Sequence, residues 1–200
     1  MTGSEWDDYA AEWDDDEAAR AYSRAAFESL QPAAAEHHLL LDGARVCDFG
    51  CGTGLLTERL VGTGAQVDAV DTSPAMLAVL DTKVERRGWT TVHTMSELPA
   101  AGPRYDLVVC SSVCGFLEDY PETVAELVSL LVPGGLFVQW DWEADPSADE
   151  PHGLTRVAIT DALAAAGLEF VTVDVGFRAE VGGETMAPLM GVGRRTGVQR

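Results

Sequence analysis

Two hydrophobic patterns alternate along most of this chain. Short apolar runs are typical of buried strands, and longer stretches with apolar residues every three or four positions are typical of helices with one buried face. We predict strands over residues 46–49, 66–71, 90–95, 105–110 and 136–141. Because helical stretches separate most of these strands, the strands are expected to lie parallel in one sheet with helices on both faces.

The predicted helices carry recognisable ends. Ser73 can cap a helix whose first turn holds Pro74, and Gly88 is placed to end it. Other helices are expected from residue 55, from residue 121 and over residues 155–166. Residues 169–175 and 185–192 are predicted strands joined by a turn at Gly182-Gly183. With no helix between them they must pair antiparallel, so we predict an α/β, doubly wound sheet of seven strands.

The N-terminal stretch is acidic, yet aromatic residues are interleaved with the acids, as at Trp6, Tyr9, Trp13 and Tyr22. Aromatic rings need a surface to bury against, so we expect a pair of helices with an aromatic face rather than a disordered tail. We predict a single domain over 1–200, with a helical cap over 1–41, a core over 42–194 and a tail over 195–200.

Composition and net charge narrow the range of partners that this protein could have. The net charge is −20, and Lys83 is the only lysine. Such a surface repels nucleic acid and anionic lipid; it could attract a cationic ligand, although a solvated acidic surface is the favoured interpretation. No apolar run is long enough to cross a membrane and the first residues are acidic, so a cytoplasmic protein is expected, with a homodimer left open.

The four cysteines form two C-x-x-x-C pairs, Cys47 with Cys51 and Cys110 with Cys114. This is not the common C-x-x-C spacing of structural zinc sites. We expect free thiols and no metal site, although the predicted topology brings Cys47 and Cys110 onto neighbouring strands.

The segment of greatest chemical interest is strand 46–49, followed by Gly50, Gly52 and Gly54 and by a helix from Leu55. Glycines that allow a ligand near the backbone, before a helix start, make a cradle for an anionic or nucleotide-like ligand. The dinucleotide pattern G-x-G-x-x-G is not met, because Leu55 stands at its last glycine position. Asp71 ends the next strand, where a carboxylate can accept from both hydroxyls of a ribose.

Residues 48–54 resemble the first motif of the class I S-adenosylmethionine (SAM)-dependent methyltransferases, acidic-x-Gly-x-Gly-x-Gly. Residues 9–14 are similar to a Tyr-Ala-x-x-Tyr-Asp run of that family, with Trp13 replacing the second tyrosine. The helix, Pro133-Gly134-Gly135 and strand that follow resemble another of its segments. The resemblance implies a Rossmann-like sheet with an antiparallel C-terminal hairpin, and SAM as cofactor.

The resemblance also implies a cofactor site. The methionine end would contact Asp48, the three glycines and Cys51, with Ser111 at its border. Asp71 would hold the ribose. Trp13 would either stack on the cofactor or simply pack in the core. The adenine edge would be read by Thr94, by the backbone of Met95 and Ser96, or by Glu97, and these alternatives stay open. Thr72 and Met76 are further expected cofactor residues.

Candidate substrate contacts come from the later strands. Cys114 and Phe116 lie in the loop that borders the transferred methyl in the family, where Gly115 and Phe116 supply no base. Trp140 and Trp142 alternate with carboxylates at a strand end and could enclose a cationic amine, or simply pack in the core. His152 is the only histidine placed to reach a substrate, although surface exposure is favoured for it.

These observations predict methyl transfer from SAM to a small molecule with an N, O or S acceptor, amine slightly favoured, through positioning rather than a dedicated base. Two alternatives stay open: a non-catalytic or atypical SAM-binding protein, and an NAD-dependent oxidoreductase.

Overall fold

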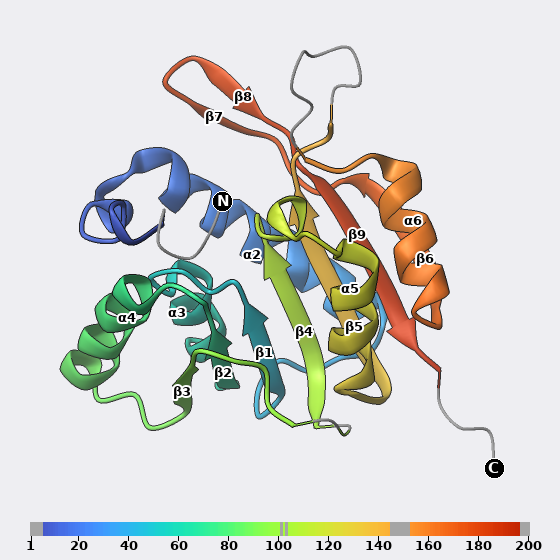
Figure 1. The fold of residues 1–200 in the computed structure, drawn as a ribbon, viewed down its shortest axis with the longest axis horizontal. Coiled ribbons are helices and arrows are strands. Elements are labelled where there is room, and N and C mark those ends of the chain that lie inside the picture. Colours follow the sequence, from blue (N-terminus) through green and yellow to red (C-terminus); the bar gives the residue numbers. More distant parts are fainter. Residues whose placement is uncertain (1–5, 101, 103, 145–152, 197–200) are drawn as a thin grey trace.

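A seven-stranded sheet with the order β3-β2-β1-β4-β5-β9-β6 forms the centre of the molecule (Figure 1). The computed structural model describes residues 6–100, 102, 104–144 and 153–196. The strands are β1 (Arg45–Phe49), β2 (Gln66–Val70), β3 (Val92–Met95), β4 (Tyr105–Ser111), β5 (Leu131–Asp141), β6 (Leu168–Val175), β7 (Ala179–Val181), β8 (Glu184–Met186) and β9 (Leu189–Arg195). β7 and β8 pair only with each other, as a separate hairpin.

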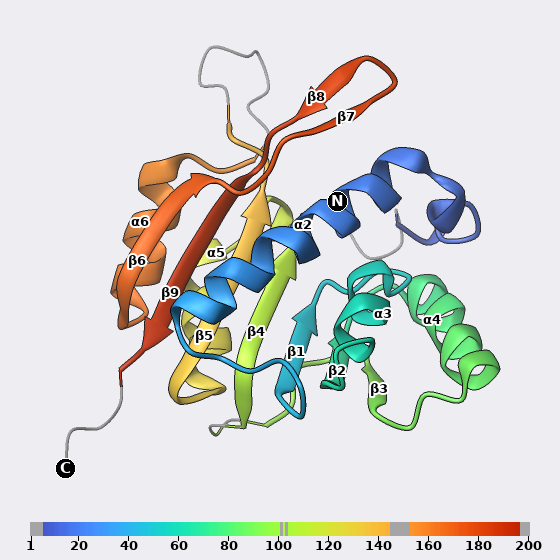
Figure 2. The same cartoon turned by 180° about the vertical axis from the view of Figure 1, so that it is seen from behind.

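Helices cover both faces of this sheet (Figures 1 and 2). The helical elements are η1 (Trp13–Asp15), α2 (Glu17–Glu36), α3 (Leu55–Val61), α4 (Pro74–Arg87), η2 (Cys114–Phe116), α5 (Tyr120–Ser129) and α6 (Arg156–Ala165). Apolar side chains of α2, α3 and α4 share one core with one set of strand residues, and those of α5 and α6 share a second core with the other set. Alternation along β1 shows the division, because Val46 belongs to the first core and Cys47 to the second.

The topology confirms the predicted fold class. Strands β3, β2, β1, β4 and β5 pair in parallel, and β9 lies antiparallel between β5 and β6. Phe49 at the end of β1 pairs with Val70 on one side and Cys110 on the other. The carboxyl ends of three strands therefore meet at one edge of the sheet, where α/β proteins hold their ligands.

The C-terminal strands differ from the prediction in one respect. The turn at Gly182-Gly183 closes the small hairpin of β7 and β8 rather than joining β6 to β9. The predicted strand over 185–192 is consequently split into β8 and β9. Pro188 lies at the break, and a proline has no N–H for a ladder hydrogen bond.

Two other predicted boundaries are wrong. The N-terminal region has the short 3-10 turn η1 and one long helix, α2, which ends at Glu36 instead of continuing to residue 41. His38 takes a left-handed backbone (φ 59°) and the Leu39 N–H donates to the Ala34 carbonyl, a common way to stop a helix. Strand β5 begins at Leu131 rather than at residue 136, with an irregular register opposite Tyr105 and Leu107.

The predicted ends of α4 are confirmed. The Ser73 hydroxyl accepts from the Met76 N–H, Pro74 occupies the first turn, and Gly88 ends the helix with a left-handed backbone. Asp16 caps α2 in the same manner, accepting from the N–H groups of Ala18 and Ala19. None of the helices in the described part of the chain combines the length and hydropathy that a bilayer crossing requires.

Candidate active site

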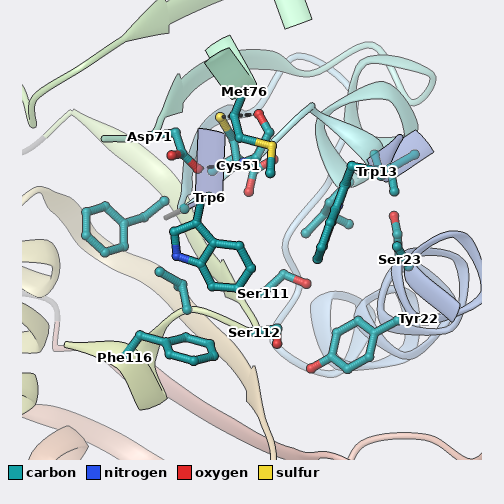
Figure 3. A pocket seen from close by; sticks show the side chains of 18 of the residues that line it. Trp6, Trp13, Tyr22, Ser23, Cys51, Asp71, Met76, Ser111, Ser112 and Phe116 are labelled. Atoms are coloured by element: carbon teal, nitrogen blue, oxygen red, sulfur yellow. Dashed lines mark hydrogen bonds between the residues drawn. The ribbon is translucent and has the colours of Figure 1, made fainter. Parts of the chain in front are cut away.

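A cavity of about 420 Å³ lies at the edge where β1, β2 and β4 end, between these strand ends and the N-terminal segment (Figure 3). In Figure 3, Asp71, Cys51 and Met76 lie at one end, and Phe116, Ser112 and Tyr22 at the other. We call these the glycine-loop end and the aromatic end. Trp6 and Trp13 also line the cavity.

The glycine-loop end is shaped by backbone conformation. Gly50, Gly52 and Gly54 all have positive φ values, of 71°, 54° and 86°. A Cβ on Gly50 would lie 2.5 Å from Val113 Cγ2, and one on Gly54 would lie 2.4 Å from Leu80 Cδ1. A Cβ on Gly52 would meet only Met76 Sδ, at 3.9 Å. The outer two glycines are therefore required by packing, whereas Gly52 leaves open space that a ligand could occupy.

Asp71 ties this loop to the end of β2. Its Oδ2 accepts from the Gly52 N–H at 2.7 Å, and its Oδ1 accepts from the Ser73 N–H at 2.8 Å. Each carboxylate oxygen has a second lone pair, and the side chain lines the cavity. Asp71 is thus held by the loop and can still accept hydrogen bonds from a ligand.

Asp48 supplies a second carboxylate, at the end of β1. The residue is fully buried and lines the cavity, and its Oδ2 accepts from the Thr57 hydroxyl at 2.6 Å. Its Oδ1 has no hydrogen-bond partner. Burial raises the pKa of this carboxyl from 3.8 to about 7. An unpaired carboxylate oxygen of this kind is suited to a cationic or N–H-bearing ligand group.

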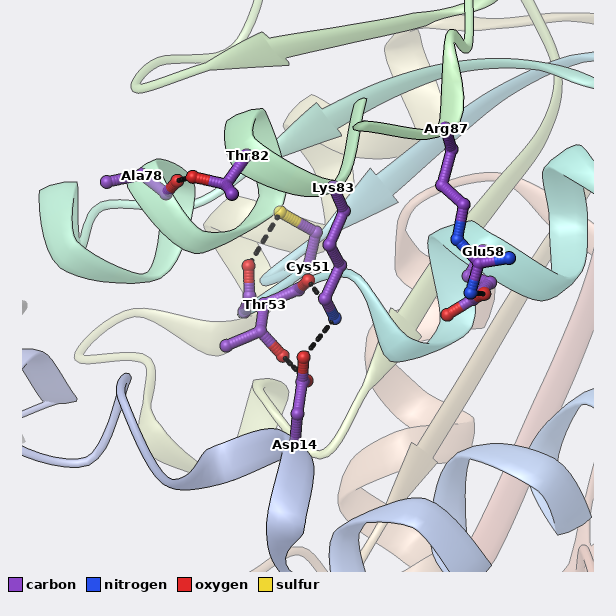
Figure 4. A network of polar contacts seen from close by, with 9 residues as sticks. Asp14, Cys51, Thr53, Glu58, Ala78, Thr82, Lys83 and Arg87 are labelled. Carbon is purple, nitrogen blue, oxygen red and sulfur yellow. Dashed lines mark hydrogen bonds and ion pairs between the residues drawn. The ribbon is translucent and has the colours of Figure 1, made fainter. Parts of the chain in front are cut away.

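Polar contacts fasten the N-terminal segment over the glycine-loop end (Figure 4). Asp14 Oδ2 lies 2.6 Å from Lys83 Nζ, and Asp14 Oδ1 accepts from the Thr53 hydroxyl at 2.7 Å. Lys83 also donates to the Thr53 carbonyl at 2.8 Å. Asp7 accepts from the Ser73 hydroxyl at 2.5 Å. We call the Asp14, Lys83 and Thr53 contacts the latch, because they join the segment to the glycine loop.

The aromatic end is made of rings and hydroxyls. Trp6 packs edge-on against Phe116, with ring centroids 5.4 Å apart, and against Trp13 at 5.9 Å. Tyr22 of α2 packs against Trp142, which follows β5, at 5.6 Å. This end therefore presents a largely apolar, aromatic wall to whatever occupies it.

Asp141 stands behind this wall at the end of β5, outside the cavity lining. It is buried, its Oδ1 accepts from the Gly115 N–H at 2.9 Å, and its Oδ2 accepts from Gln139 at 3.3 Å. Burial raises its pKa from 3.8 to about 7. Through the contact with Gly115, Asp141 holds the loop that carries Phe116.

Most of the residues expected at the site lie together in the cavity wall. The predicted residues that line it are Trp13, Asp48, Gly50, Cys51, Gly52, Asp71, Thr72, Met76, Ser111, Phe116 and Trp142. Trp13 lies in the wall between the two ends (Figure 3), and its stacking on a cofactor stays a prediction.

Other expected residues lie outside the lining. They are Gly54, Thr94, Met95, Ser96, Cys114 and Trp140. The Thr94 hydroxyl donates to Asp81 at 2.6 Å, and Cys114 is buried in the second core. Trp140 is fully buried and donates from Nε1 to Ser29, so the structure places it in the core rather than at a substrate site. His152 falls outside the described residues.

Several lining residues were not anticipated. They include Trp6, Asp16, Tyr22, Ser23, Ser112 and Met186. The aromatic N-terminal stretch gave a signal for Trp6 and Tyr22, but Ser23, Ser112 and Met186 belong to segments whose local pattern predicts nothing beyond a helix, a loop and a strand.

All four cysteines are buried free thiols. Burial raises the pKa of Cys47 and Cys51 well above the usual value, so both stay protonated. In the described ranges, no group of three or more His, Cys, Asp or Glu side chains is arranged to hold a metal ion.

The fold is the Rossmann-like fold of solved methyltransferases. The structure aligns with a methyltransferase chain from the complex with the Haloferax volcanii Trm112 methyltransferase activator, at a TM-score of 0.72 and 19% identity, over 96% of this chain and 98% of that one. It also aligns with magnesium protoporphyrin IX methyltransferase from Synechocystis PCC 6803 with bound SAM, at a TM-score of 0.65 and 20% identity. This alignment covers 86% of this chain and 80% of that one. At these identities the likeness establishes the fold.

Sequence comparison adds to this. Residues 47–139 match the family described as a methyltransferase domain. A ubiquinone biosynthesis O-methyltransferase from Xanthomonas euvesicatoria is 32% identical over 151 residues, which cover 72% of this chain and 58% of that protein. The chain thus spans less than two thirds of this relative's length. The resemblance to the class I SAM-dependent methyltransferases is confirmed, for the fold and for the central segment.

Proposed function

We propose that this protein transfers a methyl group from SAM to a small-molecule nucleophile with an N, O or S acceptor. The observation that carries the proposal is the cradle formed by Gly52, Asp48 and Asp71. It combines open space beside a glycine, an unpaired buried carboxylate oxygen and a second carboxylate fixed to the same loop.

These residues fit the chemical groups of SAM. Asp48 would hold the positively charged amino group through Oδ1, and Asp71 would accept from the ribose hydroxyls. Thr72 and Met76 line the same end and would border the nucleoside. Roles for Thr94, Met95 and Ser96 at the adenine stay predictions. SAM supplies a methyl group already activated on a sulfonium, so the chain need not activate it.

The chain's own contribution is positioning and exclusion of water. Trp6 packs against both Trp13 and Phe116 in the cavity wall, and these rings would exclude water from the reacting groups. Holding two reactants in line can account for a large part of a rate enhancement without a base in the wall. We therefore assign no residue as general base.

The acceptor is proposed to be small and neither nucleic acid nor a membrane lipid. The net charge of −20 supports this, because phosphate-rich partners would be repelled. The relatives named as O-methyltransferases support an oxygen acceptor, and the acidic lining supports a cationic amine. A cytoplasmic location and a homodimer are further parts of the proposal.

Ligand binding followed by product analysis tests the function. We expect SAM and S-adenosylhomocysteine to raise the melting temperature of the wild-type protein and to do so much less for Asp71→Ala. Incubation with SAM and a panel of amines, phenols and thiols should then release S-adenosylhomocysteine. Binding without release for the whole panel would favour a non-catalytic SAM-binding protein. Stabilisation by NADH and not by SAM would favour an oxidoreductase.

A further inference from the structure

Tyr22 carries a hydroxyl that the fold leaves without a partner. Its ring, on α2, packs against Trp142 and, with a centroid distance of 5.1 Å, against Phe177. The side chain is only 7% exposed and lines the aromatic end of the cavity. The hydroxyl lies beside Ser112 yet makes no hydrogen bond of acceptable geometry. Buried polar groups are nearly always paired, so this one points to a ligand.

The hydroxyl faces a part of the cavity wall with an unusual backbone. In Figure 3 the Tyr22 hydroxyl points toward Ser112, across from Phe116. Ser112 has a left-handed backbone (φ 57°), which is uncommon for a serine, and its N–H donates to the Trp140 carbonyl at 2.7 Å. Backbone strain of this kind gathers at ligand sites, where surrounding contacts hold it in place.

The charge of the cavity lining narrows the class of ligand that could bind there. The ionisable side chains of the lining include the carboxylates of Asp16, Asp48 and Asp71, and no Lys, Arg or His belongs to the described lining. Asp141 lies behind the aromatic end. Burial of Tyr22, together with the charge of Asp141, raises the pKa of Tyr22 well above the usual value. The tyrosine therefore keeps its proton and can donate, while an anionic ligand would find no cation to pair with.

We propose that Tyr22 is the polar contact for the methyl acceptor, and that this acceptor is an uncharged or cationic flat aromatic compound. The rings of Trp142 and Phe116 would pack against the compound, and one of its N or O atoms would accept from the Tyr22 hydroxyl. The proposal rests on the proposed function, since it takes the glycine-loop end to be the cofactor site.

Three probes of similar shape test this assignment on protein saturated with S-adenosylhomocysteine. Quinoline offers one hydrogen-bond acceptor, naphthalene offers none, and quinoline-2-carboxylate adds a negative charge. Their dissociation constants can be measured by saturation-transfer NMR. We expect quinoline to bind the wild type about fivefold more tightly than naphthalene does, the value of one hydrogen bond, and the carboxylate to bind most weakly.

Tyr22→Phe keeps the ring and removes only the hydroxyl, so quinoline and naphthalene should then bind equally well. Tyr105→Phe is the matched control, because it removes a buried hydroxyl that donates to Asp68 at 2.6 Å, outside the cavity lining. It should keep the preference for quinoline. Equal binding of the two probes to the wild type, a preference that survives in Tyr22→Phe, or tight binding of the carboxylate would overturn the assignment. Failure of S-adenosylhomocysteine to bind would instead contradict the proposed function.

Discussion

The two ends of the cavity are built in different ways. The glycine-loop end comes mainly from residues 48–56 and 70–76, and its shape depends on backbone conformation and two carboxylates. The aromatic end is assembled from side chains on α2, the loop after β4, the residue after β5 and β8. One end is thus encoded in short, continuous segments, and the other depends on tertiary packing of distant ones.

This difference predicts separable roles. Changes at the glycine loop should alter SAM binding or stability and leave acceptor selectivity unchanged, whereas changes on α2 should do the reverse. The following variants test that separation, beginning with the largest expected effect.

Gly54→Ala should have the largest effect, which is a loss of stability. The new Cβ would overlap Leu80, and alanine would be forced to a φ of 86°, so we expect the free energy of unfolding to fall by about 3 kcal/mol. Urea denaturation measures this. Gly52→Ala is the matched control, since the new Cβ has room there. Its left-handed backbone alone should lower the free energy of unfolding by only about 1 kcal/mol. Equal losses would show that packing does not distinguish the two glycines.

Gly52→Ala should instead affect the ligand. Its Cβ would point into the space assigned to SAM, and we expect SAM affinity to fall about 30-fold, or about 2 kcal/mol, by isothermal titration calorimetry. The converse change, Tyr22→Phe, should leave SAM affinity within about twofold of the wild type. If Gly52→Ala bound SAM normally, the cradle would be wrongly placed.

Asp48 should make SAM binding depend on pH. Its folded-state pKa of about 7 lies above the usual 3.8, so the empty folded protein retains a proton there that the unfolded chain releases. Its contribution to the free energy of unfolding is therefore complete below pH 3.8 and is lost as pH rises to about 7. SAM affinity should rise as the pH passes through about 7, because the carboxylate is the form that accepts from the amino group.

Calorimetry at pH 6 and pH 8 measures this dependence, and we expect affinity to increase by up to about tenfold. Asp48→Asn should abolish the increase. Asp141 has the same raised pKa but lies outside the cavity lining, so Asp141→Asn should preserve it. If Asp141→Asn removed the pH dependence and Asp48→Asn kept it, the carboxylate facing the cofactor would be misassigned.

The same contrast explains what could be predicted from the sequence. The glycine loop, Asp71 and the ends of α4 follow from local patterns, because backbone geometry and capping depend on neighbouring residues. Residues two apart on a strand face the same side, and Trp140 and Trp142 do so here, since Trp140 contacts Ser29 and Trp142 contacts Tyr22, both on α2. Which ring would be core and which would line the cavity depends on the depth of α2 over the sheet, and no local pattern carries that information.

The latch tests how far the N-terminal segment depends on the glycine loop. Lys83→Met keeps the buried stem but removes the partner of Asp14, and the loosened segment should weaken SAM binding about three- to fivefold. Because the Lys83 side of this pair is buried, added salt should change the difference between this variant and the wild type little. Calorimetry at two salt concentrations measures both effects.

Arg87→Met provides the matched control on the same helix. It breaks an ion pair with Glu58 whose side chains are 53% and 36% exposed, whereas the Lys83 side chain is only 9% exposed. An exposed pair of this kind is worth little, so SAM affinity should be unchanged. An equal effect of the two variants would mean that the charge of α4, and not the contact with Asp14, influences the cofactor. Weaker SAM binding in Lys83→Met alone would show that the N-terminal segment completes the glycine-loop end. That end would then depend on a distant segment as well as on residues 48–56 and 70–76.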